Sequence, residues 1–129
     1  MSTELTQNEL SEQVIGAAIE VHRNVGPGLL ESAYQRCMEA ELQLRGIPFR
    51  SEIALPIRYK ALAFENAYRL DLVIADQVVV ELKSTEVLLP VHSAQLLTYL
   101  RLTNYKLGLL INFNVPVLWR GISRVVNNL

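Results

Sequence analysis

The stretch YRLDLVIADQVVVELKSTEV, from Tyr68 to Val87, decides the fold that this chain is predicted to adopt. Apolar and polar residues alternate on both sides of a short polar ADQ segment, which is typical of two antiparallel strands joined by a tight turn. Asp71, Glu81 and Lys83 form the pattern D-x9-E-x-K within it. Because a hairpin brings its two halves together, the pattern predicts that two carboxylates and an ammonium meet on paired strands.

Helical and extended patterns flank this hairpin and predict an α/β fold. Two helices are expected first, over residues 7–24 and from Leu30 to a stop at Gly46, with Gly26-Pro27-Gly28 breaking the chain between them. A third helix is expected between Pro90 and Thr103. Strands are expected over residues 49–59, 62–74 and 77–83, as an antiparallel meander, and over 106–113, while 122–126 fits either a strand or a short helix. This order predicts a sheet with helices on its faces.

Length and composition set the class of protein. The chain has 129 residues, half of them apolar, and is expected to form a single domain over residues 1–129. Its single cysteine, Cys37, excludes an internal disulfide and fits a reducing cytoplasm. The N-terminal MSTELTQNELSEQ lacks the basic start of a signal peptide, and no apolar run approaches the roughly 20 residues that span a bilayer.

The overall charge is nearly balanced. A formal charge of −1 and a pI of about 6.1 argue against a surface that binds nucleic acid by charge alone. They do not exclude a nuclease, because a bound metal ion adds positive charge at the site itself.

The D-x9-E-x-K pattern is suited to metal-assisted hydrolysis. Asp71 and Glu81 offer the oxygen ligands that Mg²⁺ and Mn²⁺ prefer, and the backbone carbonyl of Leu82 offers another. Lys83 shares a strand face with Glu81, where its ammonium can orient a water molecule and stabilise charge on a phosphate. The alternative is an ordinary solvated strand face, with Asp71 paired to Arg69.

Two helices carry further candidates for the same site. Glu31 begins the second helix and is either a third acidic ligand or a carboxylate that favours the helix dipole. Gln95 and Tyr99 stand four residues apart on the third helix and share a face. Gln95 either reaches a metal ligand or a phosphate, or is a surface glutamine of an amphipathic helix.

At this point the chain resembles a known family. The stretch GLLESAY, from Gly28 to Tyr34, matches the signature for which the GxxExxY family is named. HRNVGPGLLESAY, RLDLVIADQVVVELK, HSAQLLTYL and GLLINFNV resemble the same family over nearly the whole chain. That family is placed in the PD-(D/E)XK nuclease superfamily. The resemblance therefore implies a restriction-endonuclease-like core, with a mixed central sheet flanked by helices, and Mg²⁺-dependent cleavage of nucleic acid.

The resemblance also implies roles for individual residues. By this resemblance, the metal ligands are Asp71, Glu81 and Glu31. Lys83 resembles the catalytic lysine, which Glu31 and Gln95 assist. Gln95 and Tyr99 resemble the Q-x-x-x-Y element of RecB-type exonucleases and would contact the substrate. Leu70 stands where the name of the superfamily has a proline. The expected activity is a Mg²⁺- or Mn²⁺-dependent nuclease with DNA as its expected polymer, acting as a homodimer or within a larger complex.

Other readings of the chain remain open. A non-catalytic subunit that binds nucleic acid or supports an assembly would keep the same fold. His22 and His92 flank loops and lack partners at metal-binding spacing, so a role in the site is not expected of either. Trp119 is expected to pack at the edge of the core, although a base-stacking role beside Arg120 is the alternative.

Overall fold

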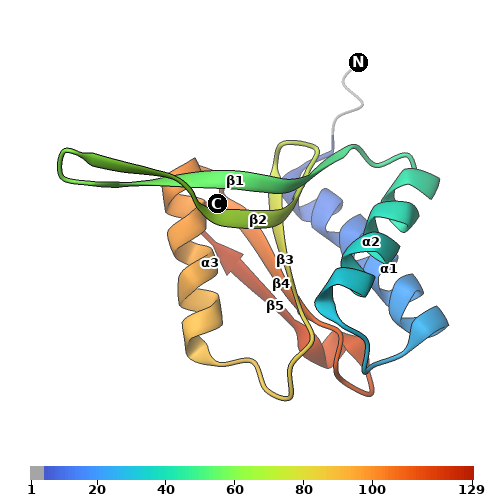
Figure 1. Cartoon of the computed structure of the whole chain (residues 1–129). Coiled ribbons are helices and arrows are strands. Elements are labelled where there is room, and N and C mark those ends of the chain that lie inside the picture. Colours follow the sequence, from blue (N-terminus) through green and yellow to red (C-terminus); the bar gives the residue numbers. More distant parts are fainter. Residues whose placement is uncertain (1–4) are drawn as a thin grey trace.

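The computed structural model describes residues 5–129, and within them three α-helices, one 3-10 helix and five strands follow one another (Figure 1). The expectation about export signals partly concerns residues 1–4, which lie outside the described residues. The elements are α1 (Gln7–Val25), α2 (Glu31–Leu44), β1 (Phe49–Tyr59), β2 (Leu62–Ile74), β3 (Val78–Lys83), α3 (Pro90–Thr103), β4 (Leu107–Asn112), the 3-10 helix η1 (Leu118–Gly121) and β5 (Ile122–Val126). The predicted helices and strands are confirmed, and the undecided last segment is a strand.

The five strands form one mixed sheet in the order β1-β2-β3-β4-β5. The first three strands pair antiparallel, which confirms the predicted meander. Strand β4 then pairs parallel to β3, after the crossover through α3, and β5 returns antiparallel to β4. The α/β class and the restriction-endonuclease-like arrangement of a mixed sheet flanked by helices are therefore confirmed.

Helices cover both faces of this sheet. Figure 1 shows α1 and α2 together on one face and α3 on the other. Leu82 and Phe113 belong to the larger core under α1 and α2, whereas Val79 and Leu110 belong to a second core with Leu96 of α3. Successive residues of β3 thus point to opposite faces, as the alternation of a strand requires.

A tight turn joins β2 and β3. Ala75 and Asp76 both have positive φ, 49° and 56°, which are the signs required at the two central positions of a type I′ turn. The backbone N–H of Gln77 donates to the carbonyl of Ile74 at 2.9 Å and closes the turn. The polar ADQ segment therefore sets the register that brings the two halves of the D-x9-E-x-K pattern together.

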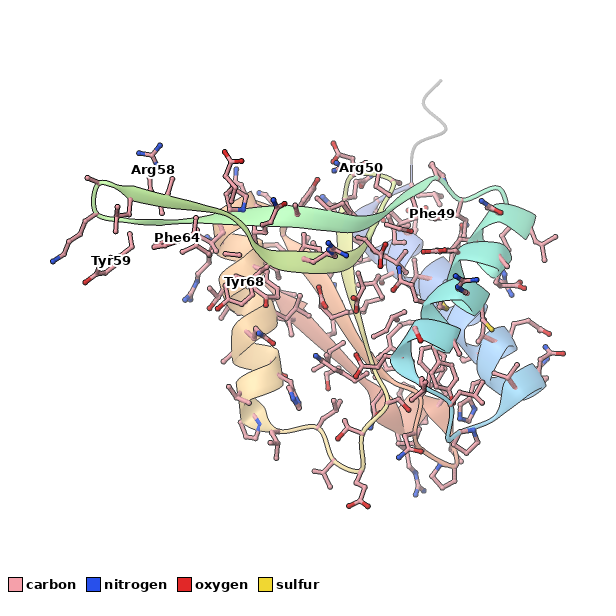
Figure 2. The ribbon with its side chains drawn as sticks, in the orientation of Figure 1. Phe49, Arg50, Arg58, Tyr59, Phe64 and Tyr68 are labelled. Atoms are coloured by element: carbon pink, nitrogen blue, oxygen red, sulfur yellow. The ribbon has the colours of Figure 1, made fainter. Side chains whose placement is uncertain are left out.

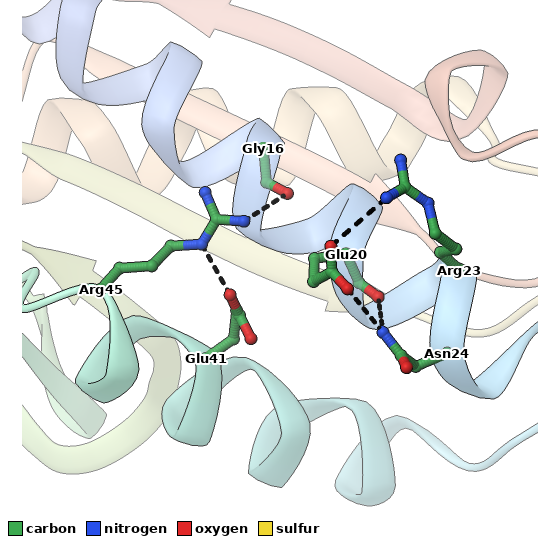
Figure 3. A network of polar contacts seen from close by, with 6 residues as sticks. All are labelled: Gly16, Glu20, Arg23, Asn24, Glu41 and Arg45. Carbon is green, nitrogen blue, oxygen red and sulfur yellow. Dashed lines mark hydrogen bonds and ion pairs between the residues drawn. The ribbon is translucent and has the colours of Figure 1, made fainter.

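Polar contacts join α1 to α2 at their solvent edge (Figure 3). Arg45, just after α2, donates to the carboxylate of Glu41 at 2.7 Å and to the backbone carbonyl of Gly16 in α1 at 3.4 Å. At the other end of α1, the Asn24 amide donates to the backbone carbonyl and the carboxylate of Glu20, both at 2.8 Å. The contact from Arg45 to Gly16 thus joins the end of α2 to α1, whereas the contacts of Asn24 lie within α1.

No helix in the part of the chain that the structure describes combines the length and the apolar character needed to cross a membrane.

Candidate metal and nucleic-acid site

The carboxylates of Asp71 and Glu81 meet where β2 and β3 separate. Leu72 and Val80 form the last register pair of the two strands at this end. Beyond it, the backbone N–H of Leu82 donates to Asp71 Oδ2 at 2.7 Å, and the backbone N–H of Asp71 lies 3.4 Å from Glu81 Oε1. Each carboxylate therefore bonds to the backbone of the opposite strand, and the pair takes the place of the next ladder hydrogen bonds.

This carboxylate pair is poorly solvated. Only 8% of Glu81 is exposed, so the alternative of a solvated strand face is wrong for this residue. Burial and the charge of Asp71 raise the pKa of Glu81 to about 9, and burial also raises the pKa of Asp71. The charge of nearby Lys83 acts in the opposite direction on both pKa values. Two buried carboxylates that repel each other favour either a proton or a cation.

An acidic cavity of about 550 Å³ lies beside Asp71. Glu31 and Glu39 from α2 and Glu52 from β1 line it, and Arg36 is its basic residue. The structure thus brings Glu31 to the same cavity as Asp71. Within residues 5–129, however, no three Asp, Glu, His or Cys side chains come close enough together to form a ready-made metal cluster.

The donor set nonetheless fits a hard divalent cation. Mg²⁺ in proteins is usually held by one or two carboxylates and keeps several water molecules, so a complete protein cage is not required. Asp71 and Glu81 supply two adjacent carboxylates, and the cavity leaves room for water beside Asp71. The residues present therefore suit Mg²⁺ or Mn²⁺ by their chemistry.

The loop before α2 holds Glu31 in place. The hydroxyl of buried Tyr34 donates to the Gly26 carbonyl at 2.6 Å and accepts from the backbone N–H of Leu29 at 3.2 Å. Ser84, directly after β3, donates to the Leu29 carbonyl at 2.5 Å. The residue that directly follows Lys83 is thus linked to the loop before α2 by a short hydrogen bond.

A second link ties α2 to β2 itself. The side-chain amide of Gln35 donates to the backbone carbonyl of Asp71 at 2.9 Å and to the carboxylate of Glu39 at 3.1 Å. Because Gln35 stands one turn after Glu31, this contact fixes the helix directly against the strand that carries Asp71.

Comparison with known protein families supplies the context for this geometry. A family model described as the PD-(D/E)XK nuclease superfamily matches residues 8–125. The chain belongs to the PD-(D/E)XK nuclease superfamily. Neither the curated proteins nor the solved structures gave a match. Members of the superfamily generally use divalent metal ions, and membership implies a nucleic-acid substrate.

The helix α3 brings a tyrosine towards the carboxylate pair. Burial and the charge of Glu81 raise the pKa of Tyr99 to about 12, and its ring lies 5.3 Å from that of Tyr68 on β2. Gln95 stands one turn earlier on α3, half-buried, and makes no hydrogen bond to any described residue. Tyr99 therefore lies within electrostatic reach of the carboxylate pair, while Gln95 has no partner that fixes its amide there.

Asn112 supports the site and was not expected to do so. Its side chain accepts from the backbone N–H of Thr85 at 3.1 Å and donates to the Thr85 carbonyl at 2.9 Å, and only 2% of the residue is exposed. It pairs with Lys83 across β3 and β4. A polar asparagine inside the apolar run KLGLLINF is the sequence signal that could have indicated this role.

The remaining candidates have structural contacts. His22 Nε2 donates to the Val115 carbonyl at 2.8 Å, and the backbone N–H of Leu89 donates to His92 Nδ1 at 3.0 Å at the start of α3. The expectation for Trp119 is wrong, because 71% of the residue is exposed. It lies in η1, where the short helix turns its side chain away from the core.

Proposed function

We propose that this protein is a Mg²⁺-dependent nuclease that hydrolyses phosphodiester bonds, with DNA as the expected polymer and Mn²⁺ as an alternative ion. The observation that carries the proposal is the pair formed by half-buried Asp71 and buried Glu81, set beside an acidic cavity and followed by Lys83, in a chain of the PD-(D/E)XK nuclease superfamily. The GLLESAY stretch supports the narrower GxxExxY family.

Asp71 and Glu81 hold the ion in this proposal. Their adjacent carboxylates would bind the ion, and Glu31 would contribute from α2, across the cavity that it lines together with Asp71. When bound, the ion supplies Lewis acidity toward a phosphate oxygen and lowers the pKa of water. Gln35 and Tyr34 act as positioning residues, because they fix α2 and its preceding loop against the strand that carries Asp71.

Lys83 provides the local positive charge. It is half-buried at the end of β3, and its charge already lowers the pKa of both carboxylates. From this position an ammonium orients the attacking water and stabilises the negative charge that develops on the phosphate. Tyr99 and Gln95 would contact the substrate from α3, with Glu31 and Gln95 assisting Lys83.

Cleavage assays test this proposal directly. Labelled single- and double-stranded DNA and RNA are incubated with Mg²⁺ or Mn²⁺, and with EDTA as the metal-free condition. Lys83→Ala and Asp71→Ala should each lower the rate at least about 100-fold, as removal of a preorganised charged group does in other enzymes. Lys106→Ala, which removes an exposed lysine directly before β4, is the matched control and should cut like the parent protein. Equal rates for all the variants would overturn the assignment.

One observation favours a second candidate, a non-catalytic subunit that binds nucleic acid or supports an assembly. No three potential ligand side chains within residues 5–129 converge as a metal cluster. Titration calorimetry separates the two candidates. The nuclease requires Mg²⁺ or Mn²⁺ binding that Glu81→Ala abolishes, whereas the non-catalytic subunit shows no such binding.

A further inference from the structure

The hairpin of β1 and β2 extends well beyond the body of the protein (Figure 2). We call residues 56–67 the arm. The register shifts between Leu55 and Ile57, and the arm then continues with Ile57 opposite Phe64 and Tyr59 opposite Leu62. With a rise of about 3.4 Å per residue, the four steps from Leu55 to Tyr59 carry the arm about 14 Å outward.

One face of the arm is apolar and exposed. Residues opposite each other in an antiparallel pair share a face, so Ile57, Tyr59, Leu62 and Phe64 lie together. Tyr59 is 59% exposed, Leu62 58% and Phe64 51%. Figure 2 shows Tyr59 and Phe64 on the side of the arm where α3 lies, and Arg58 on the opposite side. A contiguous exposed patch of this kind marks a binding surface.

This apolar face leads to the carboxylate pair. Leu55 continues it into the core and pairs with Tyr68, which is 43% exposed. The Tyr68 ring lies 5.3 Å from the ring of Tyr99, whose pKa is raised in part by the charges of Glu81 and Asp71. Aromatic rings therefore extend from the tip of the arm to Tyr68, which stands three residues before Asp71 on β2 and lies beside Tyr99.

The charges of the arm complement a phosphate backbone. Residues 56–67 contain two basic residues, Arg58 and Lys60, and one acidic residue, Glu65. Lys60 Nζ lies 5.4 Å from the centroid of the Tyr59 ring, so an ammonium and an exposed aromatic face occur together at the tip. The arm thus carries local positive charge in a chain whose net charge is −1.

We propose that the arm binds single-stranded nucleic acid, whose bases stack on Tyr59, Phe64 and Tyr68 while Lys60, beside the Tyr59 ring, contacts a phosphate. This inference rests on the proposed nuclease function and names the substrate class of that site. Stacking needs unpaired bases, since the faces of paired bases are covered within a duplex. Two basic residues against one acidic residue give the arm a net positive charge, which favours a polyanion such as nucleic acid as the occupant.

Fluorescence anisotropy with the full chain tests the proposal. Labelled oligothymidylate, oligouridylate and a DNA duplex are titrated in EDTA, so that binding is measured without cleavage. The parent protein should bind a single strand more tightly than the duplex, and the first two probes distinguish DNA from RNA. Tyr59→Ala with Phe64→Ala should weaken single-strand binding at least about fivefold per ring. Tyr59→Phe with Phe64→Tyr keeps both rings and should restore it.

A control variant and a measurement of the oligomeric state separate the possible explanations of a change in affinity. Leu44→Ala removes an apolar side chain that is 82% exposed at the end of α2, away from the arm, and should leave affinity unchanged. Equal single-strand affinity of the parent and the double-alanine variant overturns the proposal. The proposal would also be overturned if sedimentation showed that the arm substitutions convert a dimer to a monomer while the single-strand affinity stays unchanged. Arm-dependent binding without metal-dependent cleavage by the parent would support the arm's role and overturn the proposed nuclease function.

Discussion

Tyr34 and Phe113 stack with their ring centroids 4.3 Å apart and their planes inclined by only 9°. Both side chains are fully buried, and Phe113 directly follows β4. The hydroxyl of Tyr34 reaches in the other direction, to the Gly26 carbonyl and the Leu29 N–H. One side chain thus joins the core under the sheet to the loop that precedes Glu31. Within the GLLESAY stretch, Tyr34 therefore positions Glu31.

Replacement of Tyr34 by phenylalanine separates these two contacts. Tyr34→Phe keeps the stacked ring but leaves the Gly26 carbonyl and the Leu29 N–H without their partner. We expect the free energy of unfolding to fall by about 1–3 kcal/mol, measured by urea denaturation. We also expect slower cleavage, because Glu31 follows the loosened loop. Tyr59→Phe removes a hydroxyl from an exposed ring and should change stability by less than about 0.5 kcal/mol. Equal stability of the two variants would contradict the positioning role of Tyr34.

The stability of the metal-free protein should depend on pH through Glu81. Its pKa is raised from 4.5 to about 9 in the folded state, so between these values the folded protein binds a proton that the unfolded chain releases. Stability is therefore greatest below this range and declines as the pH rises through it. In EDTA, the melting temperature should fall between about pH 5 and pH 8.5, and Glu81→Gln should reduce this fall. Exposed Glu65→Gln is the control. Identical pH profiles for the parent and Glu81→Gln would rule out this linkage.

Metal binding should displace a proton. Because the carboxyl of Glu81 is protonated near neutral pH in the metal-free protein, it must ionise to bind Mg²⁺ or Mn²⁺. Calorimetric titrations in buffers with different ionisation enthalpies should therefore show release of about one proton per ion. Asp71→Asn and Glu81→Gln should both abolish ion binding, whereas Glu12→Gln on exposed α1 should not. Unchanged heats in Asp71→Asn would show that the ion binds elsewhere.

Local sequence patterns were sufficient to predict most of this fold. Alternation over Tyr68–Val87 and its polar turn defined a hairpin, and the hairpin register alone was enough to predict that Asp71 meets Glu81. The result depends on short-range geometry, because a tight turn leaves few alternative pairings. The burial of Glu81 could not be predicted in this way, since it depends on how the elements distant in sequence pack on the sheet.

The arm shows where local patterns are insufficient. Ile57, Tyr59 and Phe64 alternate with polar residues just as core-facing strand residues do, and Leu55 on the same face is buried. Whether such a face is covered depends on how far α3 extends beneath it, which is a tertiary property. The same limitation applies to Gln95, whose position on α3 follows from helical periodicity but whose contacts do not.

Two glycines provide a final comparison of packing and backbone effects. A Cβ atom at Gly121 would lie 2.2 Å from the Asn112 carbonyl oxygen, a backbone atom that cannot move without displacing the end of β4. Asn112 pairs with Lys83, so the displacement should reach the proposed site. We expect Gly121→Ala to destabilise the protein by about 1–3 kcal/mol or more and to slow cleavage.

Gly16→Ala is the matched control. Its Cβ would meet only the flexible end of Arg45, at 3.3 Å, in a helix that favours alanine by roughly 0.5–1 kcal/mol. Urea denaturation should therefore give changes of opposite sign, and a loss of stability in Gly16→Ala as large as that in Gly121→Ala would contradict the packing at Asn112.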